Sequence, residues 1–313
     1  MAEREGAMIG PLERILQLRR MPAFAALPLE ALAAIADTLR ERQFPKGAVV
    51  QREGEPVSRI QLLLDGTVAT SRHGMPMAPA GPGTPLGALL VLARDSHGFS
   101  GVAETETFSL ELDSEALLEV CEDHFVIVHE VLRFLSHWVM SVEQQFGLQS
   151  PPEKTFRRLA KGELDLVERI FFLRQIQPFE RSSVSALSEL SRGLTEVHFE
   201  PGVPLWSEGD AAHYVLLIVE GHVNCVSQRH DKRFDAGSGL AVGTMEALAE
   251  LPHWFTATTA TRVTALHGTV EGLIDVFEDN FEMAMDFAAV LARGLLAYME
   301  HAGPTMEMPT PPA

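Results

Sequence analysis

The chain repeats itself, and this constrains its fold more than any other feature. The segment LERILQLRRMPAF (12–24) aligns with VERIFFLRQIQPF (167–179) at a shift of 155 residues. The shift continues through the pair LLLDGTV and LIVEGHV, and becomes 156 after one residue is gained in the loop that follows residue 70. EDHFVIV then pairs with EDNFEMA, so the chain consists of two successive copies of one domain.

The repeat predicts where the domains begin and end. We expect the first copy over residues 11–148 and the second over 165–300. Residues 149–164 carry a Pro pair and several charges and are predicted to be a linker, and the Pro-rich tail 301–313 is predicted to be disordered. At 313 residues, of which 46% are hydrophobic, the chain is long enough for two cores.

Within each copy the hydrophobic period changes along the chain. Residues 28–42 place apolar side chains at helical spacing, and this predicts an amphipathic helix. From Phe44 onward, short β-rich runs separated by glycines indicate a small barrel or jelly roll. Residues 113–146 return to a spacing of three and four, which is typical of a long helix with an apolar seam. The predicted class is α+β, with this order of elements occurring twice.

Charge and motif content exclude several classes of protein. The net charge of −18 and the isoelectric point near 5.1 disfavour a nucleic-acid or anionic-membrane surface, which needs clustered Lys and Arg. No secretory signal or transmembrane run is evident, and two cysteines in different contexts, Cys121 and Cys225, predict buried free thiols and a cytoplasmic protein. We expect no enzyme and no metal site, because the sequence contains no nucleophile, phosphate-loop or metal-ligand motif.

Both copies carry a pattern that identifies a family. The segments FPKGAVVQREGEPVSRIQLLLDGTV and FEPGVPLWSEGDAAHYVLLIVEGHV resemble the cyclic-nucleotide-binding domains of catabolite-activator-type regulators and of kinase regulatory subunits. The resemblance covers nearly the whole chain. It implies two tandem eight-stranded jelly rolls, each flanked by N-terminal helices and a long C-terminal helix, and a short phosphate-binding segment in each. A helix-turn-helix, which the catabolite-activator relatives have, would need more residues than follow the second copy.

The resemblance also assigns the ligand-binding residues. In the family a Gly is followed by a Glu that holds the ribose, and an Arg further on pairs with the cyclic phosphate. Here the glycines are present, but neither Glu is, and a His stands at each Arg position. The candidate residues in the two copies are Gly87, Ala88, His97 and Ser100, and Gly243, Thr244, His253 and Thr256.

These replacements leave two interpretations of the pockets. Losing a desolvated Arg–phosphate pair costs about 2–5 kcal/mol, so ordinary cyclic-nucleotide binding is not expected. In one interpretation the pockets bind another anion through backbone N–H groups and the His, which gains a charge below about pH 6.5. In the other, both pockets are only structural. Two neighbours, Arg94 and Glu246, are expected to be solvated surface charges.

The long helices predict contacts with a partner. Their apolar seams should pair with each other or with a second chain, and we expect a homodimer. The predicted interface residues are Val128, Leu135, Trp138, Val139, Leu291 and Leu295. We therefore expect a non-catalytic regulatory or adaptor protein that binds an unidentified protein partner and has no cofactor. The alternative is a sensor of a cyclic nucleotide or another anionic ligand near His97 and His253.

Overall fold

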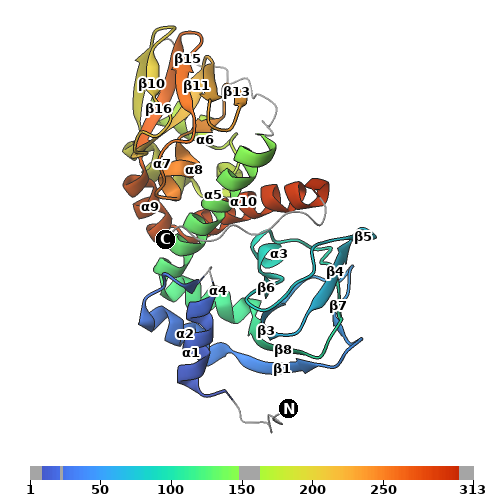
Figure 1. Ribbon diagram of the computed structural model, residues 1–313. Coiled ribbons are helices and arrows are strands. Elements are labelled where there is room, and N and C mark those ends of the chain that lie inside the picture. The colour runs from blue at the N-terminus through green and yellow to red at the C-terminus, as the bar shows by residue number, and fades with distance from the viewer. Residues whose placement is uncertain (1–8, 22–23, 148–162, 303–313) are drawn as a thin grey trace. The chain divides into compact units, whose positions relative to one another are not determined.

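The computed structural model describes residues 9–21, 24–147 and 163–302. The elements follow the order helices, β-sandwich, helices, and they do so twice (Figure 1). The helices of the first copy are α1 (Pro11–Arg20), α2 (Leu29–Thr38), α3 (Ala88–Leu92), α4 (Ser114–Asp123) and α5 (Phe125–Phe146). The second copy has α6 (Leu166–Leu173), the 3-10 turn η2 (Phe179–Arg181), α7 (Val184–Gly193), α8 (Thr244–Leu248), α9 (Val270–Asp279) and α10 (Phe281–Ala302).

Each copy contains two four-stranded antiparallel sheets, as the predicted jelly roll requires. The strands of the first copy are β1 (Arg40–Phe44), β2 (Val49–Gln51), β3 (Arg59–Asp65), β4 (Val68–Arg72), β5 (Met75–Pro76), β6 (Pro85–Leu86), β7 (Ser100–Ala103) and β8 (Thr107–Asp113). Those of the second are β9 (Thr195–Phe199), β10 (Pro204–Trp206), β11 (Tyr214–Glu220), β12 (Val223–Ser227), β13 (Lys232–Ala236), β14 (Ala241–Val242), β15 (Thr256–Thr259) and β16 (Val263–Thr269).

The two copies also share their strand order. In the first copy the sheets run β1-β8-β3-β6 and β2-β7-β4-β5, and in the second β9-β16-β11-β14 and β10-β15-β12-β13. The glycines at the corners recur at matching places. Gly66 and Gly221 both have positive φ, and a Cβ on either would overlap the backbone of a neighbouring turn. The prediction of two tandem copies is confirmed.

A shared hydrogen-bonding pattern ties the first helix of each copy to its sandwich. Arg14 donates to the carbonyl groups of Leu39 and Ile9, and Arg169 donates to those of Leu194 and Leu164. Each arginine therefore bonds the carbonyl at the end of the second helix of its own copy.

Two predicted element boundaries were wrong. The helix expected over residues 28–42 ends at Thr38, and Arg40 already pairs with Glu111 in a strand. The long helix expected from residue 113 is two helices, because the backbone leaves helical geometry at His124, between α4 and α5. Most of the predicted linker and most of the predicted disordered tail lie outside the described residues.

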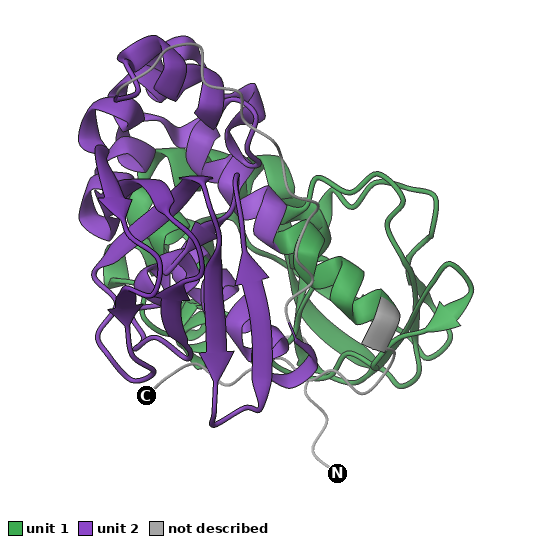
Figure 2. Cartoon of the chain, turned by 90° about the horizontal axis from the view of Figure 1, so that it is seen from above, with its two compact units in different colours: residues 1–131, 292–313 green, residues 132–291 purple. Residues whose placement is uncertain are grey.

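The chain divides into two compact units, coloured separately in Figure 2. Unit 1 comprises residues 1–131 with 292–313, and unit 2 comprises residues 132–291. The divisions fall inside α5 and α10, so the end of each long helix belongs to the unit that contains the other copy's sandwich. Leu296 of α10 packs in a core cluster with Leu90 and Phe99 of unit 1, and Met140 of α5 packs with Trp206 and Phe255 of unit 2.

Met140 and Leu296 occupy equivalent positions in the repeat, so the exchange of helix ends is reciprocal. α5 is also, among the described helices, the one that is long and apolar enough to cross a membrane by length and composition. The expectation that no segment meets this test was wrong. Core helices of soluble proteins pass the same test, and the buried side chain of Met140 favours that assignment for α5.

Candidate functional site: two modified phosphate segments

The predicted glycines begin a short helix in each copy. Gly87 precedes α3 with φ 93°, and Gly243 precedes α8 with φ 82°. Both values lie in the left-handed region that favours glycine. A Cβ at Gly87 would meet Val57, and one at Gly243 would meet His253 and Trp206. In both copies a left-handed glycine therefore directly precedes a short helix.

In unit 1 the dominant charged group is one that the sequence analysis missed. Arg72, at the end of β4, has only 7% of its side chain exposed. Its guanidinium donates to both carboxylate oxygens of Asp95, at 3.0 and 2.7 Å, and to the carbonyl oxygen of Gly98 at 2.7 Å. Its Nε donates to Glu300 of α10 at 2.7 Å. The guanidinium of Arg72 thus donates four hydrogen bonds to oxygen atoms of the protein.

Asp95 also fixes the loop that carries His97. Its carboxylate accepts hydrogen bonds from the backbone N–H groups of His97 and Gly98. The hydrogen bond from Arg72 is the largest cause that lowers the pKa of Asp95 to about 2, although burial opposes it. The hydrogen bond to Asp95 likewise raises the pKa of Arg72. The guanidinium of Arg72 and the carboxylate of Asp95 therefore form a charged pair at neutral pH.

The candidate residues of the first copy lie on different elements. The side chain of His97 is exposed, and its ring lies 6.0 Å from that of His73, centroid to centroid. Ala88 begins α3 and Ser100 begins β7, both half-buried. Arg94 is exposed, as expected.

In unit 2 the corresponding histidine is buried. His253 is 1% exposed and stacks on the indole of Trp206, with a centroid distance of 4.1 Å and an interplanar angle of 12°. Burial lowers the pKa of His253 to about 4, against an ordinary value of 6.5. The expectation that both histidines gain a charge below about pH 6.5 was therefore wrong for His253. Phe255 is buried beside it, and Phe99 is buried at the equivalent position of unit 1.

The prediction that Glu246 is a solvated surface charge was also wrong. It lies in α8 and is 2% exposed. Burial raises its pKa to about 7, and burial together with the charge of Glu246 raises the pKa of Glu143 in α5 to about 8. Two carboxyl groups that interact in an apolar environment favour protonation of at least one of them.

Several buried polar atoms of unit 2 have no hydrogen-bond partner in the described part of the chain. They include both ring nitrogens of His253, the indole N–H of Trp206, the hydroxyl of Thr244 and one carboxylate oxygen of Glu246. Thr256, the remaining candidate, accepts a hydrogen bond from the backbone N–H of Glu208 at 3.0 Å. Further unpartnered atoms of unit 2 are the hydroxyls of Ser136, Ser182 and Ser191, Nδ1 of His137 and the indole N–H of Trp138, so such atoms are not confined to α8 and His253.

The predicted interface residues are mostly buried. Leu135, Trp138 and Leu291 lie in unit 2, Val128 and Leu295 lie in unit 1, and all five are less than 9% exposed, while Val139 is half-buried. A homodimer through these side chains would therefore have to open the packing of each chain. The dimer itself stays a prediction.

The described residues show no cluster of three or more side chains that could hold a metal ion. Both cysteines are free and buried, as predicted, and burial raises the pKa of the Cys121 thiol to about 12 and that of Cys225 further. Neither thiol is suited to nucleophilic chemistry.

A β-sandwich with a left-handed glycine, a short helix and a long C-terminal helix, present twice, defines a regulatory nucleotide-binding class of fold. The sequence profile described as "Cyclic nucleotide-binding domain" matches residues 41–124 and 196–280. Together these segments make up more than half of the chain, which belongs to the cyclic nucleotide-binding domain family as two tandem copies.

Known proteins show the same likeness. A CRP-like cAMP-activated global transcriptional regulator of Mycobacterium tuberculosis is 27% identical over 124 residues, 38% of this chain and 55% of the relative. This chain thus matches about half the length of that relative. The regulatory subunit of a cAMP-independent protein kinase A from Trypanosoma brucei is 17% identical with a TM-score of 0.37, covering 95% of this chain and 94% of that one. The N-terminal domain of a transcriptional regulator from Streptomyces coelicolor A3(2) is 21% identical with a TM-score of 0.38, covering 44% and 99%.

Proposed function

We propose that this chain is a non-catalytic regulatory or adaptor protein whose two ligand pockets are degenerate and which acts through contacts with proteins. The observation that carries the proposal is the bonding of Arg72, whose guanidinium donates to Asp95, Gly98 and Glu300. A cyclic phosphate that bound Arg72 would have to replace buried charge-assisted hydrogen bonds that the protein already makes. The net free energy gained by binding would therefore be small.

The second copy supports the same conclusion by a different arrangement. His253 stacks on Trp206 and lies beside Gly243, in the segment that holds the phosphate in the family. Because its pKa is lowered to about 4, His253 is neutral near pH 7 and offers no positive charge to a phosphate. The buried free cysteines are consistent with a cytoplasmic location, which we retain as part of the proposal.

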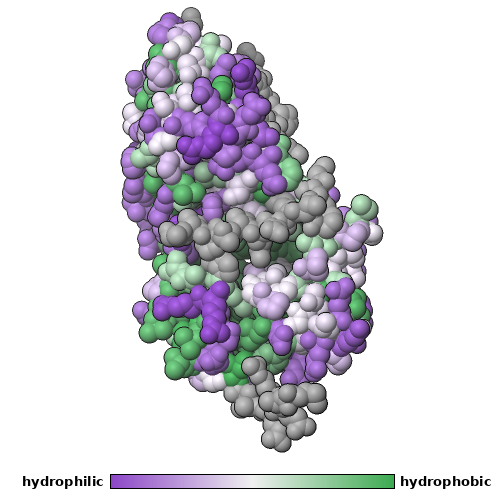
Figure 3. Space-filling model, viewed as in Figure 1, coloured by the Kyte–Doolittle hydropathy of each residue, from purple (hydrophilic) through white to green (hydrophobic). Residues whose placement is uncertain are grey.

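An exposed apolar surface that occurs on both copies supports the protein contacts. In each copy the first two helices expose three large apolar side chains at equivalent positions. They are Leu12, Leu16 and Leu29 in α1 and α2, and Val167, Phe171 and Val184 in α6 and α7. Figure 3 shows hydrophobic atoms at the lower left, where Figure 1 places α1 and α2. An isologous dimer brings one such patch against the same patch of a second chain.

Analytical ultracentrifugation tests this contact. We expect a species of twice 34.3 kDa at about micromolar concentration, and a shift toward the monomer in the variant Leu16→Ser/Phe171→Ser. Both side chains are exposed, so the variant should keep its stability within about 0.5 kcal/mol. A wild-type protein that sediments only at 34.3 kDa would remove the homodimer from the proposal.

A sensor function is the second candidate, and the unpartnered atoms of unit 2 favour it. The ring nitrogens of His253 and the indole N–H of Trp206 are buried polar groups without a partner among the described residues. Such groups are costly unless something bonds them. A small ligand that supplied the partners would stabilise the folded protein, and His253→Ala would abolish that stabilisation.

A further inference from the structure

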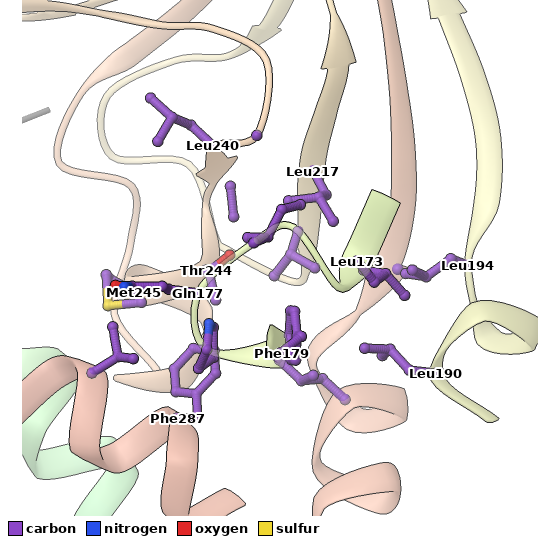
Figure 4. Close-up of a pocket in the computed structure, with 18 of the residues that line it drawn as sticks. Leu173, Gln177, Phe179, Leu190, Leu194, Leu217, Leu240, Thr244, Met245 and Phe287 are labelled. Atoms are coloured by element: carbon purple, nitrogen blue, oxygen red, sulfur yellow. The ribbon is translucent and has the colours of Figure 1, made fainter. Parts of the chain in front are cut away.

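Unit 2 contains a cavity that lies apart from the stack of His253 on Trp206. Its volume is about 540 Å³, within the range of pockets that enclose small organic molecules. One wall comes from the sandwich, through Leu217 of β11 and Met245 of α8, and the opposite wall comes from helices, through Leu173, Phe179 and Phe287 (Figure 4). Neither His253 nor Glu246 lines it.

The chemistry of the walls is apolar and uncharged. None of the lining residues is Asp, Glu, Lys, Arg or His, so an ion would find no counter-charge there. The polar side chains that line the cavity are Gln177, Ser238, Thr244 and Thr269. Ser238 already donates to the carbonyl oxygen of Val219, and Thr269 caps α9 by accepting from Gly272.

Thr244 differs from Ser238 and Thr269 because its hydroxyl has no partner among the described residues. The residue is 6% exposed, and its Oγ1 makes no hydrogen bond within the described residues. A buried hydroxyl without a partner is destabilising, and a bound group that donates or accepts one hydrogen bond would remove that cost. The sequence analysis had placed Thr244 at the ribose position, but the structure makes it part of this cavity wall.

The internal repeat shows how the space arises. Four glycines line the cavity. Gly239 is matched by Gly83 in the first copy, whereas Gly193, Gly268 and Gly272 are matched by Thr38, Leu112 and Ala116. Leu112 is completely buried in unit 1. A Cβ on Gly193 would meet nothing within 4 Å, and one on Gly268 would press on the side chain of Leu194, which also lines the cavity. The second copy has lost side-chain volume at the three places that surround this space.

We propose that this cavity is a binding site for an uncharged, mainly aliphatic small molecule that carries one hydroxyl or carbonyl group, which bonds to Thr244. The bound molecule would contact the sandwich and α10 together, through residues such as Met245 and Phe287. It would therefore hold these elements of unit 2 against each other. The proposal does not depend on whether the pockets near His97 and His253 bind anything.

Fluorescence of N-phenyl-1-naphthylamine, an uncharged apolar probe, tests the site on the full chain. We expect saturable binding of one probe per chain, and displacement of the probe by 1-octanol and by n-octane. The variant Gly193→Thr/Gly268→Leu, which restores the side chains of the first copy, should weaken probe binding at least about tenfold because it fills the space.

A second variant keeps the test decisive if the filled protein is poorly folded. Thr244→Val keeps the shape of the side chain and removes the hydroxyl, so it should weaken displacement by 1-octanol about 2- to 10-fold and leave n-octane unchanged. Thr258→Val, the same change in β15 away from the cavity, should alter neither. Absence of saturable binding, or binding that Gly193→Thr/Gly268→Leu and Thr244→Val both leave unaltered, would overturn the proposal.

Discussion

The buried carboxyl group of Glu246 predicts an unusual pH dependence of stability. Its pKa is about 7 in the folded protein against an ordinary value of 4.5. Between these two values the folded protein holds a proton that the unfolded chain has released. The free energy of unfolding therefore falls as the pH rises from 4.5, and the loss is complete above pH 7. The difference between the two pKa values corresponds to about 3 kcal/mol.

His253 acts in the opposite direction over part of this range. Its folded-state pKa of about 4 lies below the ordinary 6.5, so between these values the unfolded chain binds the extra proton and stability rises with pH. The whole-protein profile therefore mixes the two groups. A comparison of wild type with Glu246→Gln removes the contribution of His253, which is present in both proteins, and reports Glu246 together with its effect on the pKa of Glu143.

Urea unfolding followed by circular dichroism, at about pH 5 and about pH 8.5, measures the effect. We expect Glu246→Gln to gain about 2–3 kcal/mol relative to wild type between the two pH values, because the amide never has to be buried as an ion. Glu278→Gln changes an exposed carboxylate of the same unit and should show no such gain. If the difference between Glu246→Gln and wild type is the same at both pH values, the reasoning is refuted.

Two further perturbations probe the architecture by the same measurement. Arg72→Ala should lower the free energy of unfolding by about 3–5 kcal/mol, because it leaves Asp95 without its counter-charge, and a loss below about 1 kcal/mol would contradict the buried pair. Gly221→Ala should cost at least about 2 kcal/mol more than Gly202→Ala. Both glycines have positive φ, but only the Cβ at Gly221 would overlap a backbone carbonyl, and equal costs would show that the close approach is relaxed.

The repeat made much of the fold predictable. Homologous copies share their strand order and corner glycines. Aligned segments such as LLLDGTV and LIVEGHV therefore predict the same turn in each copy. Gly87 and Gly243 stand at left-handed positions that favour glycine, so the repeat keeps them at the same place in both copies. The boundaries of the helices were less certain, since an apolar residue at the end of a helix also suits the first position of a strand.

The site was less predictable because its character depends on distant neighbours. Arg72 was missed since its partners, Asp95 and Glu300, lie 23 and 228 residues away in the sequence. His97 and His253 were treated as equivalent, yet only the second has an indole to stack on. The residue equivalent to Trp206 in the first copy is Gln51, which bonds the backbone of its own turn instead.

Glu246 was assigned to the surface because a charged residue usually lies there. The end of α5 lies in the same unit and brings Glu143 near it, and no local pattern in the sequence indicates that the two helix ends are exchanged between the copies. The three cavity glycines that replace larger residues of the first copy are visible in the alignment of the repeats, but the space between them is a property of the packing.

Thermal unfolding of the protein with and without cyclic AMP and cyclic GMP, at about pH 6 and about pH 8, tests the claim that both pockets are degenerate. A ligand present at about 100 times its dissociation constant adds roughly 2.7 kcal/mol and raises the melting temperature by a few degrees. We expect no change at about millimolar nucleotide. A saturable rise that disappears in His97→Ala or His253→Ala would contradict the account and make this protein a nucleotide sensor.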